Sequence, residues 1–194
     1  MPLFNPAATS GASIPAVLNP SPDQLGYAGS TFDLTGLLSL SNTTIVTGTQ
    51  YFAFLRAVSP RAAGSVTLAY SVGTAGATVT SALFNLYVLS GGTFTQIGVS
   101  ADASAAMATA TGKTIAIPTS AALVTGASLL IGVRISATTM PQLQTGGFPS
   151  NKFPPVRNGA YSAVQGAAAA LPTTLTLATY NASALFNVFA FGLY

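Results

Sequence analysis

The strongest constraint on the fold is a period-two alternation of side chains over residues 66–72. In this run, Val-Thr-Leu-Ala-Tyr-Ser-Val, every second residue is apolar or aromatic and the residues between are small. Because successive side chains of a strand point to opposite faces, the pattern predicts a strand with one buried face. Leu129, Ile131, Val133 and Ile135 repeat the alternation and predict a second such strand.

Further strands and turns are predicted along the chain from residue 49 onward. Ser90-Gly-Gly-Thr93 separates two apolar runs, and paired glycines supply the positive φ angles of a hairpin turn. Residues 101–112 are read as an Ala-rich loop in preference to a short helix. About eight short strands without βαβ alternation predict an all-β protein, specifically an antiparallel β-sandwich that is jelly-roll-like. The remaining expected strands are 51–56, 83–89, 94–99, 114–117 (ended by Pro118), 174–180 and 185–193.

Two regions are expected. Residues 1–34 form an extended N-terminal arm, because five prolines in its first 22 residues disfavour regular structure. Residues 35–194 form the β-sandwich domain, which includes a long loop at 137–172. The arm is either a flexible tail or a segment that lies over a neighbouring subunit. Its candidate apolar anchors are Leu3, Phe4, Ile14, Val17 and Leu18.

The scarcity of charge constrains how such a protein is used. Charged residues make up 5% of the chain, against roughly 25% in ordinary soluble domains. A monomer usually stays soluble by displaying many charges, so this surface is built from small neutral residues or is covered by other subunits. We therefore expect a homo-oligomer, with a trimer as one option. The three acids are Asp23, Asp33 and Asp102, and the six bases are Arg56, Arg61, Lys113, Arg134, Lys152 and Arg157.

The same composition argues against several functions. Without His or Cys, and with three scattered Asp, the chain offers no catalytic residues, so we expect no enzyme. We expect no metal and no cofactor either, since zinc and iron prefer ligands that are missing here. Nucleic-acid binding needs clustered bases, and these are dispersed. Membrane insertion is not expected, because the longest apolar stretch, 121–135, is interrupted and too short.

The long loop is the strongest candidate for an interaction surface. Aromatic and Arg side chains anchor many protein interfaces, although the loop could instead fold back on its own sheet as a satellite core. Glycan binding is a further option, since exposed Tyr rings stack on sugars; the available residues are Tyr70, Tyr87, Tyr161 and Tyr180. The candidate interaction residues of the loop are Phe148, Lys152, Phe153, Arg157 and Tyr161.

Several runs together resemble a known β-sandwich module. They are residues 64–79, GSVTLAYSVGTAGATV; residues 82–93, ALFNLYVLSGGT; and residues 97–102, IGVSAD. Residues 123–133 and 170–175 look like a following strand and a closing element. The combination, over about residues 35–194, is similar to the β-sandwich minor tail and virion surface proteins of long-tailed phages that infect actinobacteria. The chain contains no Trp, which argues against a sugar-binding role.

The resemblance implies a structural role on a bacteriophage virion, assembled in the host cytoplasm. A minor tail protein that assembles with itself and with other virion proteins is the leading expectation. A capsid decoration protein on the phage head, whose arm would clamp shell subunits, is the alternative. A host-surface or glycan-binding adhesin module is the third option, with a host cell-surface glycan as its partner.

Overall fold

The computed structural model describes residues 28–30, 40–147, 162–165, 170–176 and 187–194. Within these residues the regular structure consists of strands, apart from one 3₁₀ turn, η3 (Ser104–Ala108). All strand pairings given for these residues are antiparallel. The predicted all-β, antiparallel class is confirmed.

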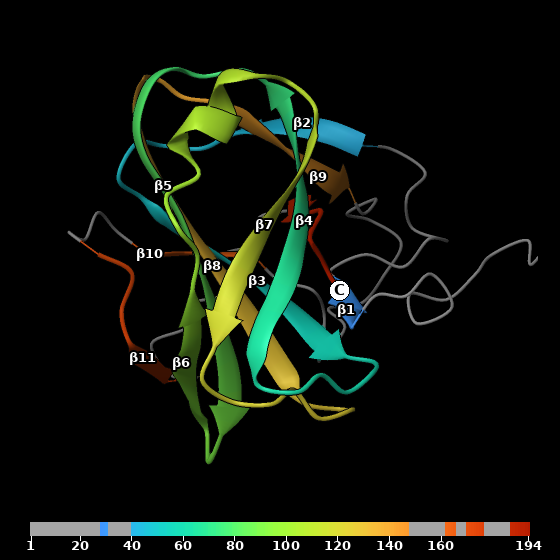
Figure 1. The fold of residues 1–194 in the computed structure, drawn as a ribbon. Coiled ribbons are helices and arrows are strands. Elements are labelled where there is room, and N and C mark those ends of the chain that lie inside the picture. Colours follow the sequence, from blue (N-terminus) through green and yellow to red (C-terminus); the bar gives the residue numbers. More distant parts are fainter. Residues whose placement is uncertain (1–27, 31–39, 148–161, 166–169, 177–186) are drawn as a thin grey trace, which may run out of the picture.

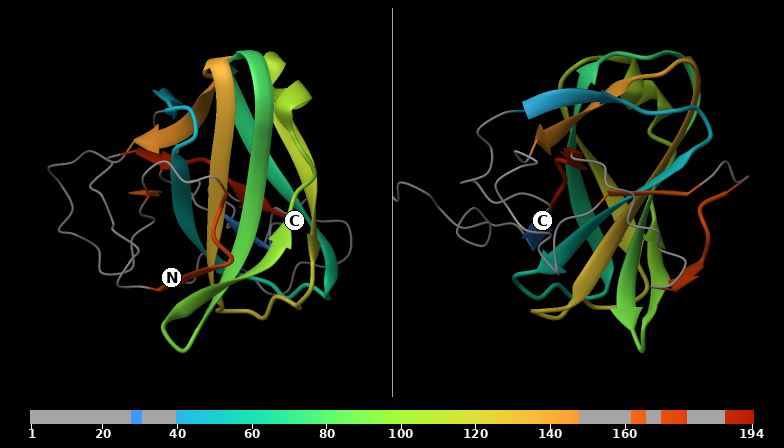
Figure 2. Two further views of the ribbon diagram at one scale, coloured as in Figure 1. Left: turned by 90° about the vertical axis from the view of Figure 1, so that its left-hand side faces the viewer. Right: turned by 180° about the vertical axis from the view of Figure 1, so that it is seen from behind.

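The main sheet curls until its pairings close on themselves (Figures 1 and 2). The path runs β3–β8–β5–β6–β7–β4–β13–β1 and returns to β3. We call this path the ring. Its strands are β1 (Gly29–Ser30), β3 (Gln50–Ala57), β4 (Gly64–Thr74), β5 (Ala77–Ser90), β6 (Thr93–Val99), β7 (Gly112–Thr119), β8 (Ser128–Thr139) and β13 (Gly192–Leu193).

Two groups of strands extend the ring. β9 (Gln142–Gly147) pairs with the end of β4 and with β2 (Leu40–Thr44) and β12 (Asn187–Phe189), which forms a small second sheet. β10 (Ser162–Gln165) pairs with β3, and β11 (Thr174–Thr176) pairs with β6. Figure 2 shows β10 and β11 on the outside of the ring.

The inside of the ring is filled by one apolar cluster, the inner core. The alternating residues of β4 point into it, as their periodicity predicts: Val66, Leu68 and Tyr70 are all less than 5% exposed. Aromatic rings meet across the interior, with Tyr70 and Phe84 at a centroid distance of 4.7 Å and Phe84 and Phe191 at 6.0 Å. Burial of these side chains is the main stabilising term of the fold.

A second cluster lies on the opposite face of β3, β8, β5 and β6, outside the ring; we call it the outer cluster. Phe52, Tyr87, Phe94 and Leu130 belong to it, and each is at most 1% exposed. In β3, Phe52 faces outward while its neighbours Tyr51 and Ala53 face the inner core. These strands are therefore covered on both faces, which explains their nearly continuous apolar sequence.

Several strand boundaries differ from the expectation. β7 does not stop at Pro118 but continues to Thr119. It pairs with β6 only at Gly98↔Thr119, so among the described residues most of β7 is an edge, where a sheet tolerates proline. The expected strand 185–193 is divided into β12 and β13 in the described residues. β5 begins at Ala77, earlier than predicted, and η3 lies inside the expected loop 101–112.

The stretch expected to be irregular, 137–172, contains strands in its described part. β8 ends at Thr139, and β9 and β10 both fall within the stretch. Prediction failed here because these short strands depend on partners far away in the sequence. The end of the expected arm differs as well, since β1 pairs with β3 and β13 and Ala28 is 0% exposed. The division of the chain near residue 35 otherwise stays a prediction.

Candidate interaction surfaces

The side chains predicted to make contacts lie outside the described residues. This holds for the loop residues Phe148, Lys152, Phe153, Arg157 and Tyr161, and for the arm anchors Leu3, Phe4, Ile14, Val17 and Leu18. Their roles stay predictions. The later part of the same long connection is described, and there β10 and residues 170–172 pack back on their own sheet.

The outer face of β4 and β7 is built from small neutral residues, which are exposed on β7 and at Ser65 and half-buried on the rest of β4. On β7 the outward positions alternate with inward ones, and Ile117 reaches the inner core while its neighbours Ala116 and Pro118 are exposed. Facing pairs across the two strands include Thr67↔Ala116. None of the outward positions carries a charge. They are Ser65, Thr67, Ala69 and Ser71 on β4, and Gly112, Thr114, Ala116 and Pro118 on β7.

The four described bases each contact neutral oxygen atoms of nearby loops. Arg56 donates from Nε to the Gly126 carbonyl at 3.2 Å, and Arg134 donates to the Gly48 carbonyl at 3.3 Å. Arg61 donates to the Ser59 hydroxyl at 3.0 Å, and Lys113 donates to the Thr109 hydroxyl at 2.6 Å. They lie on different strands and loops, so within the described residues they do not form the basic stripe that nucleic acid requires.

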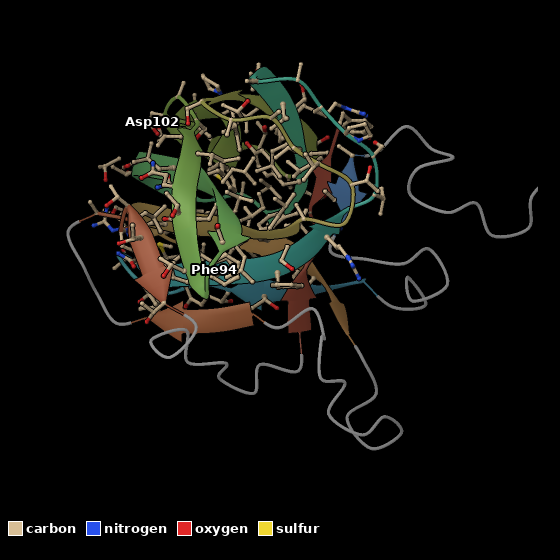
Figure 3. The ribbon with its side chains drawn as sticks, turned by 90° about the horizontal axis from the view of Figure 1, so that it is seen from below. Phe94 and Asp102 are labelled. Carbon is tan, nitrogen blue, oxygen red and sulfur yellow. The ribbon has the colours of Figure 1, made fainter. Side chains whose placement is uncertain are left out.

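Asp102 holds the connection between β6 and β7 against β5. Its Oδ1 accepts hydrogen bonds from the backbone N–H groups of Ala82 at 2.8 Å and Ser104 at 3.0 Å. These bonds, led by that from Ala82, hold the pKa of Asp102 below its usual value. Figure 3 shows Asp102 at the rim of the ring. Just beyond it, η3 inserts the fully buried Met107 into the inner core, so the contacts of Asp102 hold this connection in place.

The outer cluster is covered in part by residues 170–176, which together with residues 162–165 we call the strap. The strap buries Leu171 and Leu175 against Phe94 and its neighbours. Leu175 lies directly opposite Phe94 in the β11–β6 ladder, and Figure 3 shows Phe94 on the side of the ring that faces these strands. The strap joins both ends of the outer face, since β10 pairs with β3 and β11 with β6.

Polar contacts tie the strap to the strands beneath it. The hydroxyl of Tyr87 donates to the Pro172 carbonyl at 2.7 Å, and the Gln50 amide donates to the Ala170 carbonyl. Burial raises the pKa of Tyr87 to about 12, opposed by the hydrogen bond from Asn85. Two atoms of this region, Gln50 Oε1 and Asn85 Oδ1, are buried without a hydrogen-bond partner.

The structure corrects part of the glycan hypothesis. Tyr70 is 4% exposed inside the ring, and Tyr87 is 0% exposed beneath the strap. Neither ring can stack on a sugar. Tyr161 and Tyr180 lie outside the described residues. The contact by which Tyr87 joins the sheet to the strap was not predicted from the sequence. The signal that could have indicated it is the unbroken apolar runs of β3 and β8, which are typical of strands covered on both faces.

The remaining chemistry of the described residues is sparse. They contain no cluster of three or more His, Cys, Asp or Glu side chains that could hold a metal. No helix in the described part of the chain is long and apolar enough to cross a membrane. Comparisons with protein-family models and with curated proteins found no match for this chain.

Proposed function

We propose that this chain is a non-enzymatic structural component of a bacteriophage virion, which assembles with itself and with other particle proteins. The observation that carries the proposal is the outer face of β4 and β7, whose eight outward positions bear no charge; they are exposed on β7 and at Ser65, and half-buried on the rest of β4. A face of this kind can be buried against another subunit without desolvating ions, a step that is costly when a charge stays unpaired. The dispersed bases and the structural hydrogen bonds of Asp102 fit the same reading.

Placement on the tail is the leading form of the proposal, supported by the resemblance carried by residues 64–79, 82–93 and 97–102. The β-sandwich of that resemblance would correspond to the two walls of the ring. One wall is β3–β8–β5–β6 and the other is β4–β7, with Tyr70 and Phe84 in contact between them. A decoration protein on the capsid is the alternative placement.

Self-association is the first test of the proposal. Sedimentation velocity of the purified chain over a range of concentrations is expected to show oligomers. Replacement of Ala116 by Glu places a charge on the β4–β7 face and is expected to weaken association by about tenfold or more. Ala105→Glu, at an exposed position of η3, is the matched control and is expected to leave association unchanged.

The control variant separates a specific effect of charge at the β4–β7 face from a general effect of added charge on association. If the unsubstituted chain sediments as a monodisperse monomer at high concentration, the proposal fails. If Ala116→Glu and Ala105→Glu associate equally well with the unsubstituted chain, the β4–β7 face is not the contact.

Copy number separates the two placements. Quantitative mass spectrometry of purified particles of a phage that encodes the chain would give a few copies to a few dozen for a tail protein. Hundreds of copies per particle would place the chain on the shell. Absence of the chain from such particles, together with adhesion of the purified protein to host cells, would favour an adhesin instead.

A further inference from the structure

We infer that β7 pairs edge to edge with β7 of a second copy of this chain, antiparallel and about a two-fold axis at Thr114. The inference rests on the proposed function, because it names one contact through which the subunits of an assembly join. A strand at the edge of a sheet carries a row of backbone groups that a strand of another chain can satisfy. A two-fold contact uses the same surface of both copies, so an antiparallel edge can be its own partner.

The backbone groups of every second residue of β7 point away from β4. The Val72 N–H donates to the Thr111 carbonyl at 3.1 Å, and the β4–β7 ladder continues from there without a shift of register. Because these groups alternate in direction along an antiparallel strand, odd-numbered residues of β7 face β4 and even-numbered residues face the other side. On that other side, the Ser120 N–H donates to the Ile97 carbonyl at 2.8 Å. Pro118, which has no N–H, also lies at an even-numbered position.

Three of the residues that face away from β4 form an open row. In the part of the chain that the structure describes, β7 meets β6 only at its C-terminal end, so the backbone groups of Gly112, Thr114 and Ala116 have no strand partner. The row ends at Pro118, whose carbonyl oxygen lies against Gly98 of β6, where an added Cβ atom would be 2.5 Å from it. The three residues of the row are exposed, and Figure 1 shows β7 beside β4 in the wall of the ring.

The open row is its own complement about Thr114. When the axis passes between the Thr114 residues of two copies, Gly112 of each copy faces Ala116 of the other. Facing residues of this class exchange both of their N–H···O=C bonds, so every backbone group of the row gains a partner. An axis at Ile115 would instead place Gly112 opposite Pro118, which has no N–H to donate and is already covered by β6.

The charge of Lys113 is compatible with this contact. Lysine often protects an edge strand from pairing, but here its side chain lies on the inner side of β7 and donates to the Thr109 hydroxyl at 2.6 Å. With the axis at Thr114, Lys113 faces Ile115 of the other copy, whereas an axis at Lys113 would place two like charges opposite each other. The aliphatic stem of Lys113 then covers part of the half-buried Ile115.

A disulfide formed across the axis tests the pairing, since the chain has no Cys of its own. Facing residues of this class are about 5.5 Å apart between Cα atoms, within the range that a disulfide spans. Oxidised Thr114→Cys is expected to give a covalent homodimer on a denaturing gel. Ala116→Cys is the matched control, because it is exposed on the same face of the same strand, while its two copies are about 14 Å apart in this pairing.

Thr114→Cys is expected to give at least several-fold more covalent dimer than Ala116→Cys. If Thr114→Cys fails to fold by circular dichroism, differently tagged Gly112→Cys and Ala116→Cys chains are co-expressed, and their heterodimer is expected to exceed both homodimers. A Cβ atom at Gly112 meets nothing within 4 Å, so this position accepts the side chain. Equal dimer yields from Thr114→Cys and Ala116→Cys, or no covalent dimer from either design, would overturn the pairing.

Sedimentation velocity of the unsubstituted chain separates failure of the pairing from failure of the proposed function. An oligomer without preferential cross-linking of Thr114→Cys overturns the pairing and leaves the structural role standing. A monomer at high concentration, again without the covalent dimer, overturns both.

Discussion

The hydroxyl of Tyr87, on β5, donates a hydrogen bond of 2.7 Å to the carbonyl oxygen of Pro172, 85 positions further along the chain. A second buried tyrosine, Tyr70, has a hydroxyl without a hydrogen-bond partner. The two residues therefore form a natural comparison. Each ring is packed in an apolar cluster, and they differ in what the hydroxyl does.

Replacement of Tyr87 by Phe is expected to lower the free energy of unfolding by about 1–2 kcal/mol, because the Pro172 carbonyl loses its donor while remaining part-buried. Tyr70→Phe removes an unsatisfied hydroxyl and is expected to be neutral or slightly stabilising. Urea denaturation of the two variants measures both changes. Equal losses would show that the Tyr87–Pro172 bond contributes nothing specific.

Alkaline pH is expected to remove the contribution of Tyr87. Burial raises its folded-state pKa to about 12 from 10.0, so the folded state holds its proton where the unfolded state releases it. The stabilisation is therefore complete below about pH 10 and is lost as pH rises toward about 12. The advantage of the unsubstituted chain over Tyr87→Phe should shrink across this window. A constant difference between about pH 9 and about pH 12 would contradict the assignment.

Asp102→Ala is expected to destabilise the fold by about 1 kcal/mol, because the backbone N–H groups of Ala82 and Ser104 lose their acceptor. Asp102→Asn keeps an acceptor oxygen and should lose less. The lowered pKa of Asp102 implies that its contribution is present above the unfolded pKa and is lost as pH falls below it. Thermal unfolding of both variants near neutral and acidic pH tests this, and an identical acid response of Asp102→Asn and the unsubstituted chain would refute it.

Gly132→Ala is expected to destabilise the chain by about 1–3 kcal/mol through overpacking. Gly132 lies in the middle of β8, where a Cβ atom would meet ring carbons of Phe52 at 3.0 Å and of Tyr87 at 3.2 Å. Gly112→Ala is the matched control, since a Cβ at that position of β7 meets nothing within 4 Å. Chemical denaturation should give a loss for Gly132→Ala and little change for Gly112→Ala. Similar midpoints would mean that the rings move aside at little cost.

The strands with a clear local pattern could be predicted from the sequence. The alternation over 66–72 corresponds to β4, and the paired glycines at 91 and 92, both with positive φ, form the predicted hairpin turn between β5 and β6. These features depend on residues that are neighbours in sequence, so local chemistry determines them. The burial of Val66, Leu68 and Tyr70 in the inner core follows from the same periodicity.

The parts that were missed depend on distant partners. β2 and β10 are short, and each exists through one long-range pairing, with β9 and with β3. The outer cluster was not foreseen, because the alternation of Leu129 and Ile131 was read as one buried face, whereas Leu130 is buried on the other. A composition poor in charge could indicate assembly, but it could not locate a surface.

The ring is joined at its seam by β1 and β13, two-residue strands from almost opposite ends of the sequence. The ribosome synthesises β1 long before β13, so the two strands cannot pair until translation has passed Leu193. Until then, a nascent chain carries an unsealed sheet. A recombinant chain that starts after Ser30 would lack β1 and could not form the β1–β13 and β1–β3 pairings.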